Sequence, residues 1–435
     1  MGNFFLIYRY EILKVTKKKI VRMFFAIIFI LNLLINLHSI IDYSVGSMGT
    51  DMDVPNKYGR QISYMKAFMK GDVILRHVDD KGMVIEEKVG PLEYIRRVRE
   101  YAMKWSGIPL DDRTINEMRD FLDQYDYQDE TGYSYGWSFQ NYYWVYKSIF
   151  FTGLNPEGSN VSEDLIRSSM EENWRNVYDA EQLTEEERAF WDACPRLAFP
   201  LKMAYLPAYY NLITSAEKTH IMLLFFVIIS LCGCFSSDRE NGLRQITQAA
   251  PKAVHKAAIA RLCAGETIIL AAGLILYLTS FMVQFTLFGT DGFHTPLQQV
   301  MGMAWSKLMI TAGQGVLLLC GCSLLICLSI GAVTMLLSQL SQSSVASLAL
   351  TGVFLLLSLL YEYQIFYEDR QLSQLIRYLP IQRIAPDFLY DERLVSLAGR
   401  LVPAIPLTLG IYPGIMILAL ILCVASSVRG WLDRN

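Results

Sequence analysis

A glycine-flanked serine is the first feature of this sequence that could carry catalysis. Gly132-Tyr133-Ser134-Tyr135-Gly136 matches the Gly-x-Ser-x-Gly pattern of an acyl-transfer nucleophile. That pattern works when a buried strand precedes the serine and a helix follows it. The preceding residues 126–130 are polar and turn-like. We therefore expect an aromatic loop at this position and not a nucleophile.

The sequence lacks the residue patterns that bind a metal ion or a nucleotide. Two Cys-x-Cys pairs occur, at Cys232/Cys234 and Cys320/Cys322, but no histidine clusters with them. On a helix, moreover, residues two apart point to different faces. The sequence contains neither a Gly-x-x-x-x-Gly-Lys-Ser/Thr phosphate loop nor a His-Glu-x-x-His zinc motif. It therefore predicts a protein that is not an enzyme and that has no catalytic residue, metal or cofactor of its own.

Long uncharged stretches dominate the chain and define the elements expected. Of its 435 residues, 53% are hydrophobic and 19% charged, below the roughly 25% charge of soluble proteins. No Asp, Glu, Lys, Arg or His lies between Lys307 and Glu362, and about 20 apolar residues of helix cross a bilayer. We expect an α-helical membrane protein with six transmembrane helices, at 21–41, 217–236, 264–288, 306–338, 345–361 and 404–428.

The basic residues predict how these helices are oriented. Residues 1–22 hold six basic residues and one acid, 236–261 five and two, and 429–435 two and one. Segments rich in Lys and Arg stay in the cytoplasm. An interfacial amphipathic helix at 1–20 and the tail 429–435 are therefore expected on that side of the cell membrane. A cleaved signal peptide at the first span is the alternative. The net charge of −3 gives no basic footprint for nucleic acid.

Residues 42–215 then form a large extracellular domain between the first two spans, helical or mixed α and β. This segment carries 29 acids, 19 basic residues and a single cysteine, Cys194. A strand or a hairpin is expected within 73–89, with a turn at 79–82. Thr184 and Glu187 have the spacing of a capping box. Helical patterns cover 92–104, 114–125, 162–178 and 184–191.

Aromatic residues are concentrated in residues 125–151 of this domain. Tyr and Trp offer rigid surfaces with a polar tip, which suit a ligand or the membrane interface. The same residues also fill the core of a small helical domain, and both interpretations stay open. The candidate external ligand surface consists of Tyr133, Tyr135, Trp137, Tyr143 and Trp144.

The loop between the second and third spans, residues 237–263, indicates a function. It begins with charged residues, continues as an amphipathic stretch and is broken by Pro251, as in a short helix lying on the inner membrane surface. Such a loop docks onto a cytoplasmic partner or merely connects two spans. The candidate contacts to such a partner are Asp238, Arg239, Glu240, Asn241, Gly242, Leu243, Ile246 and Pro251.

In this loop the chain resembles the membrane subunits of ABC-2-type transporters, permeases that pair with a separate ATPase. Arg239-Glu240-Asn241-Gly242 matches the family's acidic Glu-x-Gly-type start, Ile246–Ala250 its coupling helix, and Pro251 the proline that follows. Leu243 stands where that family usually has Thr, and Arg261 where it has Lys. The resemblance extends to the six spans, to the basic N-terminal helix, and to residues 362–402, which are similar to re-entrant external helices.

The resemblance implies a complex that exports or flips its substrate. Its partners would be two cytoplasmic ABC ATPase subunits, which bind the ATP, a second permease chain, identical or homologous, and membrane lipids. Closure of the ATPases would push on the loop and open the pathway outward. The expected substrate is hydrophobic or amphipathic, such as an antimicrobial peptide, a drug or a lipid, because the spans offer no fixed charge for a small ion.

Two other classes of protein stay open. A membrane receptor or sensor would explain the acidic external domain but not six spans with so little cytoplasmic mass. A secondary transporter would show an internal repeat or ionisable groups in the membrane, and neither is visible in the sequence. Glu266 lies near the inner end of the third span, where it could snorkel to the membrane surface or pair with Arg261. The remaining polar residues at membrane depth are expected at helix–helix contacts; they are Asn32, Asn36, Gln284 and Gln314.

Overall fold

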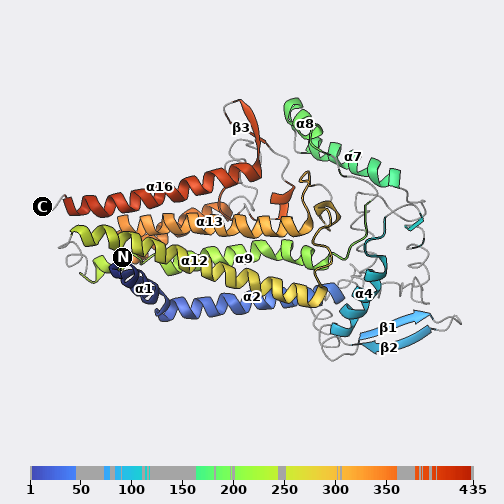
Figure 1. The fold of residues 1–435 in the computed structure, drawn as a ribbon, viewed down its shortest axis with the longest axis horizontal. Coiled ribbons are helices and arrows are strands. Elements are labelled where there is room, and N and C mark those ends of the chain that lie inside the picture. The colour runs from blue at the N-terminus through green and yellow to red at the C-terminus, as the bar shows by residue number, and fades with distance from the viewer. Residues whose placement is uncertain are drawn as a thin grey trace, which may run out of the picture.

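A bundle of long apolar helices carries smaller elements at one of its ends (Figure 1). The computed structural model describes residues 2–45, 73–78, 84–89, 91–109, 113–114, 117, 163–180, 183–195, 197, 201–242, 251–300, 302–303, 306–359, 378–381, 384, 386–390, 394–397 and 399–432. The helices of the bundle and of the end opposite these smaller elements are α1 (Gly2–Thr16), α2 (Lys19–Val45), α9 (Pro207–Leu231), α10 (Ser236–Glu240), α12 (Pro251–Phe288), α13 (Ala312–Leu340), α14 (Ser344–Leu359) and α16 (Ala404–Leu432).

Five helical segments of the described chain are long and apolar enough to cross a membrane. They are Lys19–His38, Pro207–Glu240, His255–Phe288, Ala312–Leu340 and Ala404–Ser427. This fits the expected α-helical membrane protein. The remaining expected span corresponds to α14, which has 16 residues and at 1.5 Å per residue is shorter than a bilayer core of about 30 Å.

Three helices begin at other residues than expected, because residues at their N-terminal ends determine where each helix starts. Both α9 and α12 begin earlier than expected, each with proline in its first turn, at Pro207 and Pro251, where a missing N–H costs nothing. Helix α13 begins later than the expected residue 306 because Thr311 caps it. The Thr311 Oγ1 accepts from the Gln314 amide at 3.2 Å, and the Gln314 side chain accepts from the Thr311 amide at 3.0 Å.

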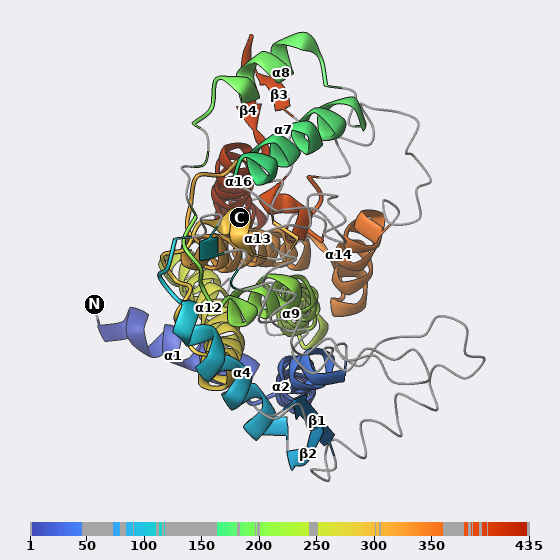
Figure 2. The same cartoon turned by 90° about the vertical axis from the view of Figure 1, so that its right-hand side faces the viewer.

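Helices α9 and α13 form the centre of the bundle. In the most apolar 18-residue stretch of each span, 72% of the residues are buried for α9, against 22% for α2 and for α16. Glycines let α12 and α13 approach closely: a Cβ on Gly273 would meet Leu324, and one on Gly331 would meet Ile269. Small residues serve this purpose in membrane helix packing. Viewed along the bundle, α14 stands beside it, and α1 extends sideways (Figure 2).

The smaller elements include most of the secondary structure expected in residues 42–215. Strands β1 (Val73–Val78) and β2 (Val84–Val89) pair antiparallel, and the helices are α4 (Pro91–Trp105), α7 (Glu163–Ala180) and α8 (Glu185–Asp192). The capping box is present, with the Thr184 amide donating to Glu187 at 2.8 Å. Most of the helix expected at 114–125 lies outside the described residues.

A second hairpin precedes α16 and differs from the helices expected in 362–402. Strands β3 (Leu394–Leu397) and β4 (Arg400–Pro403) pair antiparallel, and the 3-10 helix η4 spans Pro386–Leu389. Residues 360–377 lie outside the described part. Tyr178, Leu183 and Trp191 pack with Leu394, so helices α7 and α8 are fixed to this hairpin.

Candidate functional site

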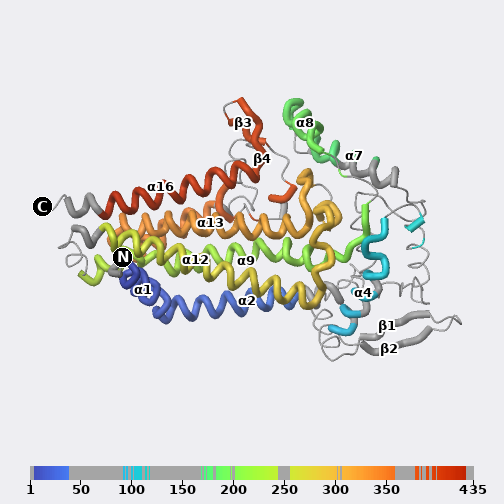
Figure 3. The backbone as a smooth tube through the Cα atoms, in the orientation of Figure 1, coloured from blue at the N-terminus to red at the C-terminus, as the bar shows by residue number. Residues whose placement is uncertain are grey.

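The start of the 237–263 loop forms a short helix, α10, at the end of the bundle where α1 and the α13–α14 turn also lie (Figure 3). The side chain of Ser338 in α13 fixes its first turn. Its Oγ accepts from the amides of Phe235 at 3.0 Å and Ser236 at 3.1 Å. These amides are among the N-terminal donors that a short helix cannot satisfy internally. Helix α10 is therefore attached to α13 at its first residue.

Four charged side chains from three helices form a closed ring beside α10. The Asp238 carboxylate lies 2.6 Å from the Lys14 Nζ and 2.7 Å from the Arg261 guanidinium. Arg261 also contacts Glu11 at 2.8 Å, and Glu11 lies 4.0 Å from Lys14. The side chains of Glu11, Asp238 and Arg261 are 6%, 10% and 11% exposed. Burial of such charges requires partners of opposite sign, and the ring supplies two acids and two bases.

Arg261 does not bind Glu266, the partner that the sequence suggested for it. Its guanidinium binds Glu11 and Asp238 and lies 4.9 Å from the centre of the Phe235 ring. Glu266 is not its partner, because α1 brings Glu11 closer. Both carboxylate oxygens of Glu266 are buried without a hydrogen-bond partner among the described residues.

Arg239 binds the C-terminal end of α13. Its guanidinium donates to the carbonyl oxygens of Leu340 at 3.3 Å and Ser341 at 2.8 Å, and also to that of Gln339. The last carbonyls of a helix have no partner within the helix and carry partial negative charge. A planar guanidinium with several donors suits such a cluster of acceptors.

Glu240 binds the N-terminal end of the next helix, α14. One carboxylate oxygen accepts from the Ser344 amide at 2.7 Å and the other from the Ser344 Oγ at 3.1 Å. A carboxylate at a helix N-terminus meets free amides and the positive end of the helix dipole. Arg239 and Glu240 thus hold both sides of the α13–α14 turn, and we call these two residues the turn clamp.

The other candidate contact residues end the helix or lie beyond it. The Asn241 side chain donates to the Ser237 carbonyl at 2.8 Å, and Gly242 has a φ of +69°, which favours glycine. Pro251 is the first residue of α12. Leu243 and Ile246 lie outside the described residues.

Glu11, Lys14 and Ser338 belong to this site and were not identified from the sequence. One signal was available, because Glu11 is the single acid among six basic residues in positions 1–22. A lone acid in a basic segment predicts a nearby cation but does not say which one. The aromatic candidates Tyr133, Tyr135, Trp137, Tyr143 and Trp144, and Ser134, lie outside the described residues.

Buried polar residues at mid-bundle join α2, α9 and α12, as expected. The Asn32 side chain donates to Ser280 at 3.1 Å and accepts from Thr219 at 2.8 Å. The Gln284 side chain donates to the Asn36 carbonyl at 3.0 Å. These side chains satisfy one another, so they are helix–helix contacts. Gln314 instead serves the cap of α13. In the described chain, no group of three His, Cys, Asp or Glu side chains could hold a metal.

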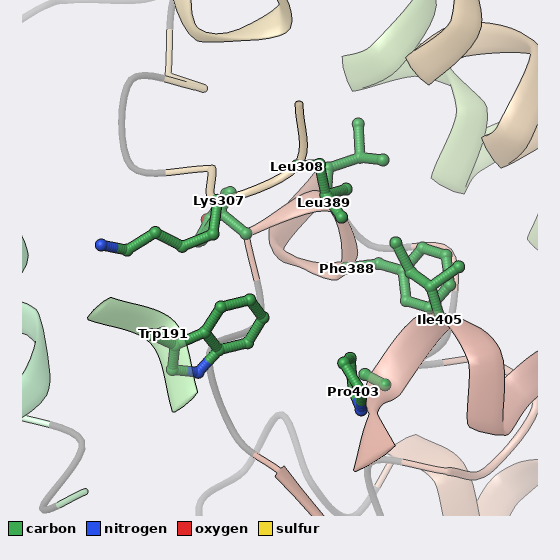
Figure 4. Close-up of a pocket in the computed structure, with 9 residues that line it drawn as sticks. Trp191, Lys307, Leu308, Phe388, Leu389, Pro403 and Ile405 are labelled. Atoms are coloured by element: carbon green, nitrogen blue, oxygen red, sulfur yellow. The ribbon is translucent and has the colours of Figure 1, made fainter. Parts of the chain in front are cut away.

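A small pocket at the opposite end lies between α8, the hairpin and the start of α16 (Figure 4). Trp191, Lys307 and Leu389 contribute to its lining. The Lys307 Nζ lies 3.6 Å from the centre of the Trp174 ring and donates to the Tyr178 hydroxyl at 2.9 Å. The lysine is thereby bound to α7, and the pocket is part of the contact between the small elements and the bundle.

Comparison with known proteins adds no assignment. No protein-family model and no curated protein matches the chain. The contacts around α10 therefore carry the functional argument.

Proposed function

We propose that this chain is the permease subunit of an ABC-2-type transporter, driven by two separate ATPase subunits and paired with a second permease chain. The attachment of α10 supports this proposal most directly. Asp238 connects α10 to α1 and α12, and Arg239 and Glu240 connect it to α13 and α14. A segment that only linked two spans would not need ties to four other helices.

These contacts give a route for mechanical coupling. A partner that pushes on the loop after Gly242 acts on α10, and the ion pairs and the turn clamp pass the displacement to α1, α12, α13 and α14. Charge-assisted hydrogen bonds are short and directional, so they transmit displacement better than apolar contacts alone. ATP-driven closure of the two ATPases would then rearrange the helices and open a pathway outward.

The arrangement of the bundle agrees with the rest of the proposal. The N-terminal helix and the C-terminal end of α16 lie at the same end of the bundle (Figure 1). This agrees with six spans and cytoplasmic termini, where α14 would be a short fifth span. The polar side chains of Asn32, Ser280 and Thr219 are paired with one another. A hydrophobic or amphipathic substrate, such as an antimicrobial peptide, drug or lipid, suits such a bundle.

Purification from mild detergent together with a candidate ATPase tests the proposal. We expect a stoichiometric ATPase whose activity the permease stimulates, and Glu240→Ala should remove most of that stimulation. Glu117→Ala is the matched control, because Glu117 is likewise an exposed glutamate bound to another residue, Arg113 at 2.7 Å, but lies outside the bundle. Absence of an associated ATPase would make the assignment wrong. Equal stimulation with both variants would instead make the role of α10 wrong.

Glu266 favours a second candidate, a secondary transporter coupled to protons. An intramembrane carboxylate without a partner is by default a functional site, and both oxygens of Glu266 are buried in this way among the described residues. Proteoliposomes with an imposed pH gradient and no ATPase separate the two classes. Gradient-driven uptake that Glu266→Gln abolishes supports secondary transport, whereas ATP-dependent transport that this variant retains supports the permease.

A further inference from the structure

Helix α1 has the reverse of the polarity expected for a helix on the surface of a soluble protein. Its charged residues Glu11 and Lys14 face the protein, where they join the ion-pair ring. Its outer face is mainly apolar, with Arg9 exposed among large apolar side chains: Phe5 is 69% exposed, Leu6 67% and Tyr10 64%. A helix whose large apolar side chains point away from the protein core requires an apolar medium on that side.

The exposed apolar face continues from α1 onto α2. Ile20 and Met23, in the first turn and a half of α2, are each 64% exposed. On the inner side of the elbow between these helices, Val15 and Val21 are 4% exposed. Since α2 is long and apolar enough to cross a membrane, the medium at its outer face is lipid, and the same lipid reaches the outer face of α1.

Basic side chains surround this elbow. Arg9, Lys17, Lys19 and Arg22 are exposed, and in the described part of the chain none of them forms an ion pair. The apolar span of α2 begins at Lys19, which places Lys17, Lys19 and Arg22 at the depth of the lipid headgroups. Seen along the bundle, α1 extends sideways from this point (Figure 2), as a helix lying in the interface would.

We propose that the outer face of the α1–α2 elbow binds anionic phospholipid, with the lipid phosphate beside Lys17, Lys19 and Arg22 and the acyl chains against Phe5, Leu6 and Met23. Charge complementarity selects this occupant, because the surface combines an apolar face with basic residues and contributes no exposed acid. Interfacial helices with basic edges bind anionic lipid through both buried apolar area and electrostatic attraction. This inference does not depend on the proposed transport function.

Native mass spectrometry of the full-length chain in a neutral detergent tests the proposal. The chain is titrated with phosphatidylglycerol or with phosphatidylcholine of the same acyl composition, and bound lipids are counted. We expect tighter binding of phosphatidylglycerol. The triple variant Lys17→Gln, Lys19→Gln, Arg22→Gln should weaken that binding by about tenfold or more, given the usual contribution of each basic residue near an anionic surface.

A matched variant removes three exposed basic residues outside the elbow, by Arg175→Gln, Lys202→Gln and Arg400→Gln, and should keep the preference. High salt should reduce the preference of the unaltered chain, since exposed charges are screened; this measurement needs no variant. Equal binding of the two lipids would overturn the proposal. So would competition by millimolar inorganic phosphate, which would identify a free anion as the ligand, or equal losses in the two triple variants.

Discussion

At the scale of single residues, two acids balance the charge of Arg261, and one of them, Glu11, lies 250 positions away in the sequence. The other, Asp238, also binds Lys14, which lies 224 positions from it. Glu11, Asp238 and Arg261 are buried beside a half-buried Lys14, and the charges of the four side chains neutralise one another. The ring therefore stabilises the junction as a unit, and loss of one member leaves the remaining charges buried without full compensation.

Replacement of Arg261 should reveal this dependence. Arg261→Gln leaves Glu11 and Asp238 with Lys14 as their one remaining cation in the ring, so we expect a loss of about 3–5 kcal/mol in the free energy of unfolding, measured by denaturation with SDS in mixed micelles. Arg113→Gln is the control, because the Arg113 side chain is 84% exposed beside Glu117, and the expected loss is less than about 1 kcal/mol. Similar losses in both variants would contradict the buried ring.

Two glycines should respond to alanine with opposite signs. Gly242 has a φ of +69° and nothing within 4 Å of an added Cβ, so Gly242→Ala costs about 1 kcal/mol through backbone strain alone. Gly352, within α14, also has open space around a Cβ but no positive φ, so Gly352→Ala should stabilise by about 0.5–1 kcal/mol. Unfolding of both variants in detergent checks the signs, and a gain at Gly242 would contradict the described end of α10.

At the scale of elements, a buried amide determines how α2 packs against α9 and α12. Asn32 is fully buried and bonds to Ser280 and to the Leu276 carbonyl in α12, and to Thr219 in α9. Because the helices are apolar elsewhere, these bonds fix their register and rotation. Apolar side chains alone would allow several arrangements.

Asn32→Leu should show how much the hydrogen bonds of Asn32 contribute beyond apolar packing. It removes the side-chain hydrogen bonds to Leu276, Ser280 and Thr219 and leaves the two hydroxyls with fewer partners, so we expect a loss of about 1–3 kcal/mol in unfolding free energy. Thr279→Val is the control, because its hydroxyl donates only to the Ile275 carbonyl of its own helix. The variants are compared by SDS denaturation, and an unchanged Asn32→Leu would show that the network does not hold these helices.

At the scale of the whole molecule, the bundle has two chemically different ends. Helix α1 lies at one end, where Asp238 joins α10 to it, and α4, α7, α8 and the hairpins lie at the other (Figure 1). Specific contacts join the second group to the bundle: Arg99 of α4 binds Asp291 at 3.1 Å, and Lys307 binds Tyr178 at 2.9 Å. The small elements are thus fixed to the ends of several long helices.

Cysteine labelling on intact cells should show on which side each end lies. In a Cys194→Ser background, a membrane-impermeant maleimide should label Lys202→Cys without permeabilisation, because the side chain at 202 is exposed in the expected external domain. Asn241→Cys, also exposed, should react only after lysis. Labelling after lysis is also the control, because the cysteines at positions 202 and 241 must then both react. The reverse pattern would invert the orientation that the basic residues predict.

The sequence alone determined the features that depend on local properties of the chain. The lengths of the uncharged segments predict the apolar helices, because each segment must by itself be long and apolar enough to cross a bilayer. Capping chemistry gives the start of α8 at Thr184, and turn residues between apolar runs give the pairing of β1 with β2. Each of these depends on residues within a few positions of one another.

Only the tertiary structure decided the partners of the charged residues and the exact course of the segment before α16. Arg261 lies five positions from Glu266 in the sequence, yet it binds Glu11 of α1 and Asp238 of α10. Residues 394–403 form a hairpin that packs on α7 and α8, where external helices were expected. In both cases the stabilising contacts are made by groups that are distant along the chain. No local sequence pattern specifies which of these groups meet.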